Sequence, residues 1–117
     1  MVTEEQKRVP ARFYRTAAGG EPVREWLLGL EKDERKQIGT DIATVEYGWP
    51  IGMPTCRPMG SGLHEVRTDL GTKKIARVLF CIHEQQMVLL HGFIKKTPQT
   101  PKADIDLARK RMKEVTK

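Results

Sequence analysis

The sequence predicts an α+β fold: a small antiparallel sheet with an N-terminal helical hairpin and a C-terminal helix. Two segments between residues 22 and 48 repeat apolar residues at spacings of three and four, as amphipathic helices do. Three later runs, between residues 63 and 93, are extended, largely apolar and separated by short polar turns, which is typical of a β-meander. We expect the helices to lie on one side of the sheet.

The chain opens with a predicted strand over residues 8–15, and Pro10 places this strand at an edge because proline cannot donate to a neighbour. A helix follows over residues 22–30. Pro22 suits its first turn, and Trp26 lies on the apolar stripe by which the helix should pack.

The second helix is expected from Asp33, a suitable N-cap, to Gly48. Residues 48–62 are rich in glycine and proline, and we expect an irregular connection there. The predicted strands of the meander span residues 63–68, 74–83 and 86–93.

Both faces of the run 74–83 are largely apolar, which predicts a central strand. The last helix is expected to begin with Thr100 as N-cap and Pro101 in the first turn. Its acidic residues come early and its basic residues late, an order that complements the helix dipole.

The composition of the chain limits the classes of function that it can have. The chain has 117 residues, the size of one domain, which we place at residues 1–117, and a net charge of +6. Such a charge favours a polyanionic partner such as nucleic acid. No stretch reaches the length of a membrane span, so the expected location is the cytoplasm, without a membrane partner. Cys56 and Cys81 lack metal-ligand or redox spacing.

Several cations interrupt the predicted strands. Glu65 and Arg67 are two apart and share a face, Arg77 lies on the next strand, and Lys95 and Lys96 follow the last strand. Together, the arginines and lysines of this group would bind a phosphate. Each alone is more often a solvated surface charge. Arg77 differs, because a cation among apolar residues needs a partner, and we weigh a function and an ion pair with Glu65 equally.

RNA carries its own nucleophile, the 2′-hydroxyl, so a protein that cleaves it needs positioning, proton transfer and positive charge around the phosphate. The predicted cluster meets most of that list. His64, His83 and His91 have no metal-ligand spacing, and we expect neither a metal nor another cofactor.

A resemblance to a known family rests on motifs that span nearly the whole chain, in order: Gly-Trp-Pro-Ile-Gly-Met-Pro at 48–54, Gly-Leu-His-Glu-Val-Arg at 62–67, Ala-Arg-Val-Leu-Phe at 76–80 and Leu-Leu-His-Gly-Phe-Ile-Lys-Lys-Thr at 89–97. The sequence resembles the phage-derived Gp49-like, HigB branch of the RelE/ParE toxin superfamily. This resemblance implies a RelE-like fold and the toxin of a type II toxin–antitoxin system.

The resemblance further implies a metal-independent mRNA endoribonuclease that acts on the ribosome and inhibits translation. Carried onto this sequence, the family's catalytic and phosphate-binding positions are Arg67, Arg77, Lys95 and Lys96, with Glu65 as a candidate base or positioning group. The expected RNA contacts are Arg57, His64, Lys73 and Lys74. A Lys is the preferred general acid, because arginine holds its proton at neutral pH.

The expected partners are the ribosome with its mRNA and a HigA-like helix-turn-helix antitoxin, through which the toxin would reach operator DNA. His64 stands where this branch is expected to carry Trp or Tyr, so stacking, titration and packing stay open for it. Two other functions remain alternatives: a gyrase-poisoning ParE-like toxin and a non-catalytic nucleic-acid-binding module.

Overall fold

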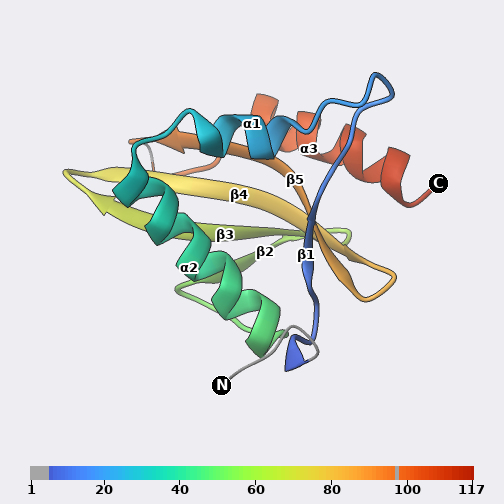
Figure 1. Cartoon of the computed structure of the whole chain (residues 1–117), viewed down its shortest axis with the longest axis horizontal. Coiled ribbons are helices and arrows are strands. Elements are labelled where there is room, and N and C mark those ends of the chain that lie inside the picture. Colours follow the sequence, from blue (N-terminus) through green and yellow to red (C-terminus); the bar gives the residue numbers. More distant parts are fainter. Residues whose placement is uncertain (1–5, 97) are drawn as a thin grey trace.

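A computed structural model describes residues 6–96 and 98–117 and gives a small α+β protein with a five-stranded mixed sheet (Figure 1). The strand order is β1-β5-β4-β3-β2. The elements of the described part are β1 (Ala11–Phe13), α1 (Pro22–Leu28), α2 (Lys32–Gly48), β2 (Cys56–Gly60), β3 (Leu63–Gly71), β4 (Lys74–His83), β5 (Gln86–Lys95) and α3 (Lys102–Val115).

The meander is confirmed: β3, β4 and β5 are consecutive antiparallel neighbours, and β4 is the central strand. The sheet is not purely antiparallel, however, because β1 pairs with β5 in parallel, at the edge that Pro10 predicted. The chain between these two strands is long enough for the crossover that a parallel pair needs. Local sequence carries no information on which partner a short edge strand takes.

The prediction of an irregular connection over residues 48–62 is wrong in its second half. Residues Cys56–Gly60 form β2, which pairs antiparallel with β3 and has a register shift between Pro58 and Gly60. β2 is the other edge of the sheet, where a proline without an N–H group costs no hydrogen bond with a further strand. The glycine and proline content therefore obscured a short edge strand.

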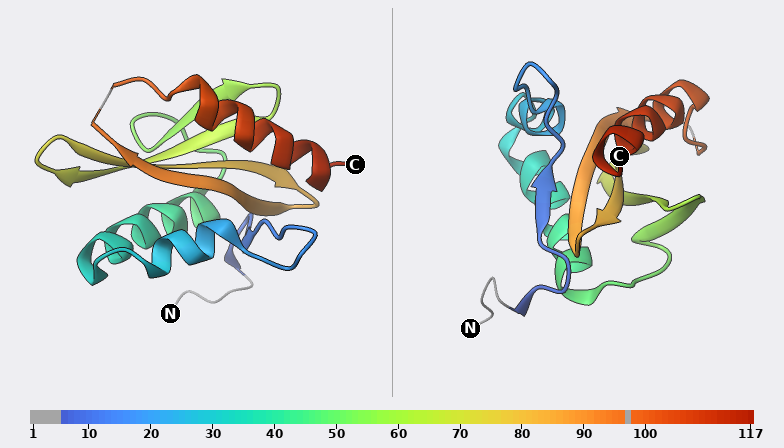
Figure 2. Two further views of the ribbon diagram at one scale, coloured as in Figure 1. Left: turned by 90° about the horizontal axis from the view of Figure 1, so that it is seen from above. Right: turned by 90° about the vertical axis from the view of Figure 1, so that its right-hand side faces the viewer.

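The helices do not share one side of the sheet. Figure 2 shows α1 and α2 on one face and α3 on the other. The reason is visible in β4, where Val78 and Phe80 belong to the core beneath α1 and α2 whereas Leu79 and Cys81 belong to the core beneath α3. An apolar strand of this kind needs cover on both faces.

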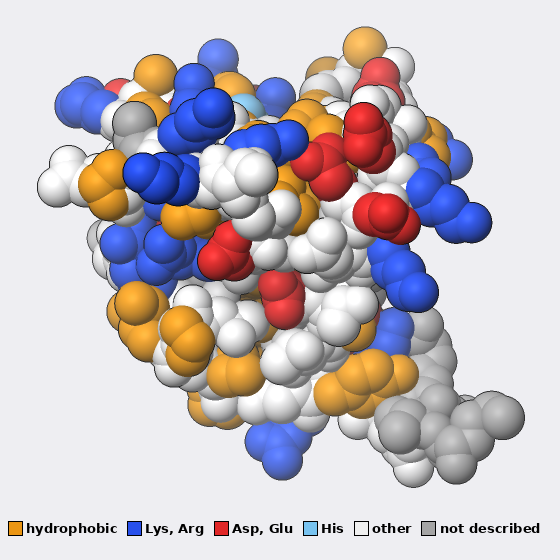
Figure 3. Space-filling model, turned by 90° about the vertical axis from the view of Figure 1, so that its left-hand side faces the viewer, with side chains coloured by type: hydrophobic (Ala, Val, Ile, Leu, Met, Phe, Trp, Pro, Cys, Tyr) orange, Lys and Arg blue, Asp and Glu red, His pale blue; other side chains and the backbone are white. Residues whose placement is uncertain are grey.

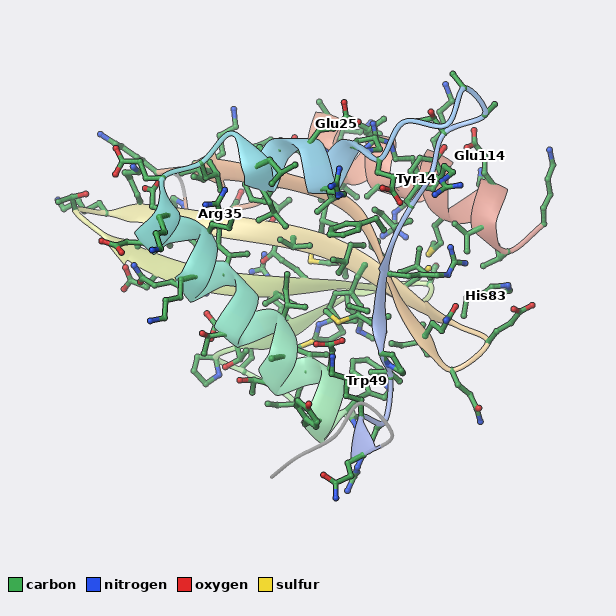
Figure 4. All side chains as sticks on the ribbon, in the orientation of Figure 1. Tyr14, Glu25, Arg35, Trp49, His83 and Glu114 are labelled. Carbon is green, nitrogen blue, oxygen red and sulfur yellow. The ribbon has the colours of Figure 1, made fainter. Side chains whose placement is uncertain are left out.

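α1 and α2 contact different strands, because α1 packs mainly on β5 and α2 on β3. A hairpin in which the two helices pack along each other is therefore not confirmed. Trp26 anchors α1 as expected, since its ring lies directly over Gly92 of β5. On the opposite face, the hydroxyl of Tyr14 donates to Glu114, which joins the segment after β1 to the end of α3 (Figure 4).

Among the described residues, no helix combines the length and the apolar character that crossing a bilayer requires.

Candidate functional site

The register of the sheet brings five charged residues to the α3 side. Arg57 of β2 lies opposite Glu65 of β3, Arg67 lies opposite Arg77 of β4, and Lys95 lies at the end of β5 beside Ile75. Because cross-strand neighbours and residues two apart share a face, these side chains emerge from one surface. We call Arg57, Glu65, Arg67, Arg77 and Lys95 the charged cluster.

Glu65 is a buried member of the charged cluster, and its carboxylate is hydrogen-bonded within the protein. Its side chain is fully buried, and both carboxylate oxygens are used. Oε1 accepts a hydrogen bond from Nη2 of Arg57 at 3.2 Å, and Oε2 accepts one from the hydroxyl of Thr100. Arg57 also donates to the Thr100 hydroxyl oxygen at 3.2 Å. A carboxylate held in this way is suited to orienting Arg57 rather than to meeting a substrate.

Thr100 was expected to cap the last helix, but its hydroxyl is engaged by Glu65. The helix begins two residues later, at Lys102, with Pro101 in the capping position and no side-chain cap. The segment that connects β5 to α3 is thus fastened to the sheet through β2 and β3.

Arg77 is also fully buried, and its Nη2 donates to the carbonyl oxygen of Pro98 at 3.0 Å. Burial lowers the pKa of Arg77; Glu65 raises it, and the neighbouring cations Arg67 and Arg57 lower it. A guanidinium nevertheless stays protonated at neutral pH. Arg77 therefore contributes a fixed positive charge beneath the surface and holds the β5–α3 segment.

The accessible cations of the cluster are Arg57, Arg67 and Lys95. Arg67 is half-buried, and its Nε is inaccessible to solvent and has no hydrogen-bond partner in the described part of the chain. A buried donor without a partner carries a desolvation cost. Lys95 is exposed on the same face, whereas Lys96, also exposed, lies in the bend after β5.

A hollow adjoins Arg67 at the edge of β3, beyond the end of its pairing with β2. Its cavity measures about 270 Å³ and is lined by Asp41, Pro54, Thr55, Arg67, Asp69 and Ile75. A neighbouring cavity of about 280 Å³ shares Asp41 and Asp69 and continues toward α2. On this side of the molecule, basic side chains gather in one region with acidic side chains next to them (Figure 3).

The structure does not bring His64 to the charged cluster. Its ring lies on the opposite face of the sheet, 4.8 Å from the ring of Trp49 and 5.4 Å from that of Phe80. Burial lowers the pKa of His64. Trp49 lies at the end of α2, next to the sheet (Figure 4), so this aromatic group packs the loop against the core.

Lys73 and Lys74 also lie apart from the cluster. Lys73 is exposed in the turn between β3 and β4, and Lys74 forms an ion pair with Glu34 of α2 at 2.8 Å. This hydrogen bond raises the pKa of Lys74. Any contact they make with RNA would be at the tip of the hairpin.

A contact between β5 and α3 was also not predicted from the sequence. His91 of β5 bonds through Nε2 to Oδ1 of Asp104 at 2.6 Å and stacks on Phe93, with ring centroids 5.4 Å apart. The two partners are thirteen residues apart on different elements, so no local pattern marks them. The contact ties the first turn of α3 to β5.

In the described ranges, no three His, Cys, Asp or Glu side chains are arranged to hold a metal ion. The chemistry on the α3 side is instead that of arginine and lysine beside one another, which suits phosphate groups. The fold and this face together define a small α+β protein with a cationic sheet surface.

The chain belongs to the family described as "Phage derived protein Gp49-like", whose model matches residues 25–113. This family is associated with RelE/HigB-like toxins, so the chain is a toxin-like module, and the match is compatible with a toxin of the nuclease type. No curated protein matches the sequence.

Proposed function

We propose that this protein is the toxin of a type II toxin–antitoxin system and that it cleaves mRNA on the ribosome without a metal. The observation that carries this proposal is the presence of Arg67 and Lys95 as accessible cations on one face, above the buried charge of Arg77. Family membership gives the biological setting. As an agent that acts on ribosomes, it would work in the cytoplasm.

The proposed reaction uses the 2′-hydroxyl of the RNA as nucleophile. Its oxygen attacks the adjacent phosphorus, its proton passes to water, and the bond from phosphorus to the 5′-oxygen of the next nucleotide breaks. Arg67 and Arg57 neutralise the charge that develops on the phosphate. Lys95 donates a proton to the departing 5′-oxygen, so the products are a 2′,3′-cyclic phosphate and a 5′-hydroxyl.

Glu65 and Arg77 act as positioning residues in this proposal. Glu65 orients Arg57, and Arg77 holds the β5–α3 segment, so neither needs to touch the RNA. The proposed neutralising partner is a HigA-like helix-turn-helix antitoxin, and the toxin would meet operator DNA only through that complex. Co-expression with the antitoxin should restore the growth of cells that produce the toxin.

The experiment that tests the function is primer extension on mRNA that is being translated by purified ribosomes in the presence of the protein. Wild type should create new 3′ ends within codons. Lys95→Met and Arg67→Gln should each reduce the cleavage rate by about 100-fold or more, in the range for losing a proton donor or a charge-stabilising group.

Lys32→Met and Arg24→Gln serve as matched controls, because both side chains are exposed on helices of the opposite face. They should cleave at the wild-type rate. Lys96→Met should reduce the cleavage rate less than Lys95→Met does. Absence of new 3′ ends with wild type would overturn the proposal; gyrase-dependent DNA breaks would then support the ParE-like alternative, and RNA binding alone the non-catalytic one.

A further inference from the structure

The cavity beside Arg67 combines hydrogen-bond acceptors with apolar walls. Asp69 lies two residues beyond Arg67 on β3, and Asp41 faces the same space from α2. Ile75 and Pro54 supply apolar surface. At about 270 Å³, the cavity is just below the range of roughly 300–1,000 Å³ for pockets that enclose a drug-sized ligand, so it suits a single planar ring system.

The two carboxylates are available to a ligand. Oδ1 of Asp69 accepts a hydrogen bond from the backbone N–H of Gly71 at 2.9 Å, which orients the group and leaves Oδ2 without a partner among the described residues. The side chain of Asp41, on α2, has no hydrogen bond or ion pair within residues 6–96 and 98–117. Carboxylates only accept hydrogen bonds, so the ligand that fits them must donate.

Arg67 supplies positive charge at this cavity. Arg67 is one of the residues that line the cavity, and a guanidinium binds phosphate through its N–H donors. A nucleotide whose phosphate contacts Arg67 would therefore present its base to Asp69 and Asp41. Proteins read the bases of single-stranded RNA in this way, by hydrogen bonds to base edges.

We propose that this cavity is a nucleobase-recognition site in which Asp69, supported by Asp41, selects guanine at a nucleotide next to the scissile phosphate. The inference rests on the proposed function and adds a specificity-determining residue to it. Guanine places two donors, N1–H and the N2 amino group, side by side, and both reach one carboxylate. Adenine and cytosine have one amino donor beside an acceptor. Uracil has a single N–H between two carbonyl oxygens, which the carboxylates repel.

The first experiment measures binding of the mononucleotides 5′-GMP and 5′-UMP to the purified protein by NMR titration. A good two-bond contact to a base edge discriminates by about 10- to 100-fold, so 5′-GMP should bind at least about 10-fold more tightly than 5′-UMP. Asp69→Asn replaces one acceptor oxygen by a donor and should bring the two affinities within about twofold. Asp106→Asn is the matched control, because Asp106 is exposed on α3 and pairs with Lys102.

The second experiment uses translated mRNA with guanosine or inosine at the preferred position, since inosine lacks the N2 amino group. Wild type should cleave the inosine message about 10-fold more slowly, and Asp69→Asn should cleave both at equal rates. Asp41→Asn should reduce the preference, and it provides a second variant if Asp69→Asn does not give the wild-type circular dichroism spectrum.

The outcomes separate the two proposals. Cleavage by wild type without any base preference, or equal binding of 5′-GMP and 5′-UMP, would overturn the base-recognition site and leave the endoribonuclease standing. A guanine preference that persists in both aspartate variants would also overturn it. Selective binding of 5′-GMP without cleavage on ribosomes would overturn the endoribonuclease alone.

Discussion

At the scale of single residues, burial separates charged groups that hold the structure from those that face solvent. Glu65 and Arg77 expose none of their surface and bond to Arg57, Thr100 and the Pro98 carbonyl. Removing one partner of a buried charged pair leaves the other uncompensated. A variant of Glu65 or Arg77 can therefore lose activity because it unfolds, so its stability has to be measured as well. Variants of Arg67 and Lys95 test the role of the cationic surface directly.

His64 gives a prediction at this scale. Burial lowers its pKa in the folded protein, whereas histidine in an unfolded chain has a pKa of about 6.5. Below that pH the unfolded state binds more protons than the folded state, so this contribution to the free energy of unfolding is complete above about pH 6.5 and is lost as the pH falls toward the lowered value. His64→Phe, which keeps a ring between Trp49 and Phe80, should weaken the decrease in stability between pH 7.5 and pH 5.

Urea denaturation at several pH values checks this expectation. Wild type and His64→Phe should have similar midpoints at neutral pH and should diverge on acidification, with the variant more stable. Parallel curves for the two proteins throughout the range would show that His64 is not a source of acid sensitivity.

At the scale of elements, the position of α1 depends on a glycine. A Cβ atom added at Gly92 of β5 would lie 2.4 Å from Cε3 of Trp26, which is too close for any side chain. The absence of a side chain at Gly92 leaves room for the ring of Trp26, and it lets α1 lie close to the sheet. Neither residue indicates this contact locally, because they are 66 positions apart.

Gly92→Ala should lower the free energy of unfolding by about 1–3 kcal/mol, the usual cost of overpacking a core. Gly39→Ala, on α2, is the matched control. A Cβ atom at this position would meet nothing within 4 Å, so the substitution should raise the free energy of unfolding by about 0.5–1 kcal/mol. Adding Trp26→Leu to Gly92→Ala should recover part of the loss. Urea denaturation measures the free energy of unfolding of the three variants. A Gly92→Ala protein as stable as wild type would contradict the close contact between Gly92 and Trp26.

At the scale of the whole molecule, the chain has a net charge of +6, and the accessible cations of the charged cluster lie on the α3 side of the sheet. Binding of single-stranded RNA should weaken as salt increases, because each neutralised phosphate releases counterions and contributes about −0.7 to the slope of log K against log salt concentration. Three contacts, from Arg57, Arg67 and Lys95, predict a slope of about −2.

Fluorescence anisotropy of a labelled oligoribonucleotide between 50 and 200 mM salt measures this slope. Arg67→Gln should make it less steep by about 0.7. Arg24→Gln, on the opposite face, should leave it unchanged. An equal change in both variants would mean that the net charge, rather than the charged cluster, governs binding.

The sequence was sufficient for features that depend on local pattern. Helical periodicity located α1 and α2, and a proline in the first turn with the order of charges indicated α3. Alternation along the strands put Glu65 and Arg67 on one face, with Arg77 on the neighbouring strand. The apolar character of both faces of the run 74–83 identified β4 as central. These features follow from backbone geometry that each segment adopts by itself.

Only the tertiary structure decided features that need distant segments to meet. The pairing of β2 with β3 set Arg57 against Glu65, and the register of β5 put Lys95 on the face of the cluster. The parallel contact of β1, the cover of both sheet faces and the engagement of Thr100 by Glu65 also arose there. The physical reason is that hydrophobic burial and buried charge pairing act between surfaces that come together only in the folded chain, so no window of the sequence contains both partners.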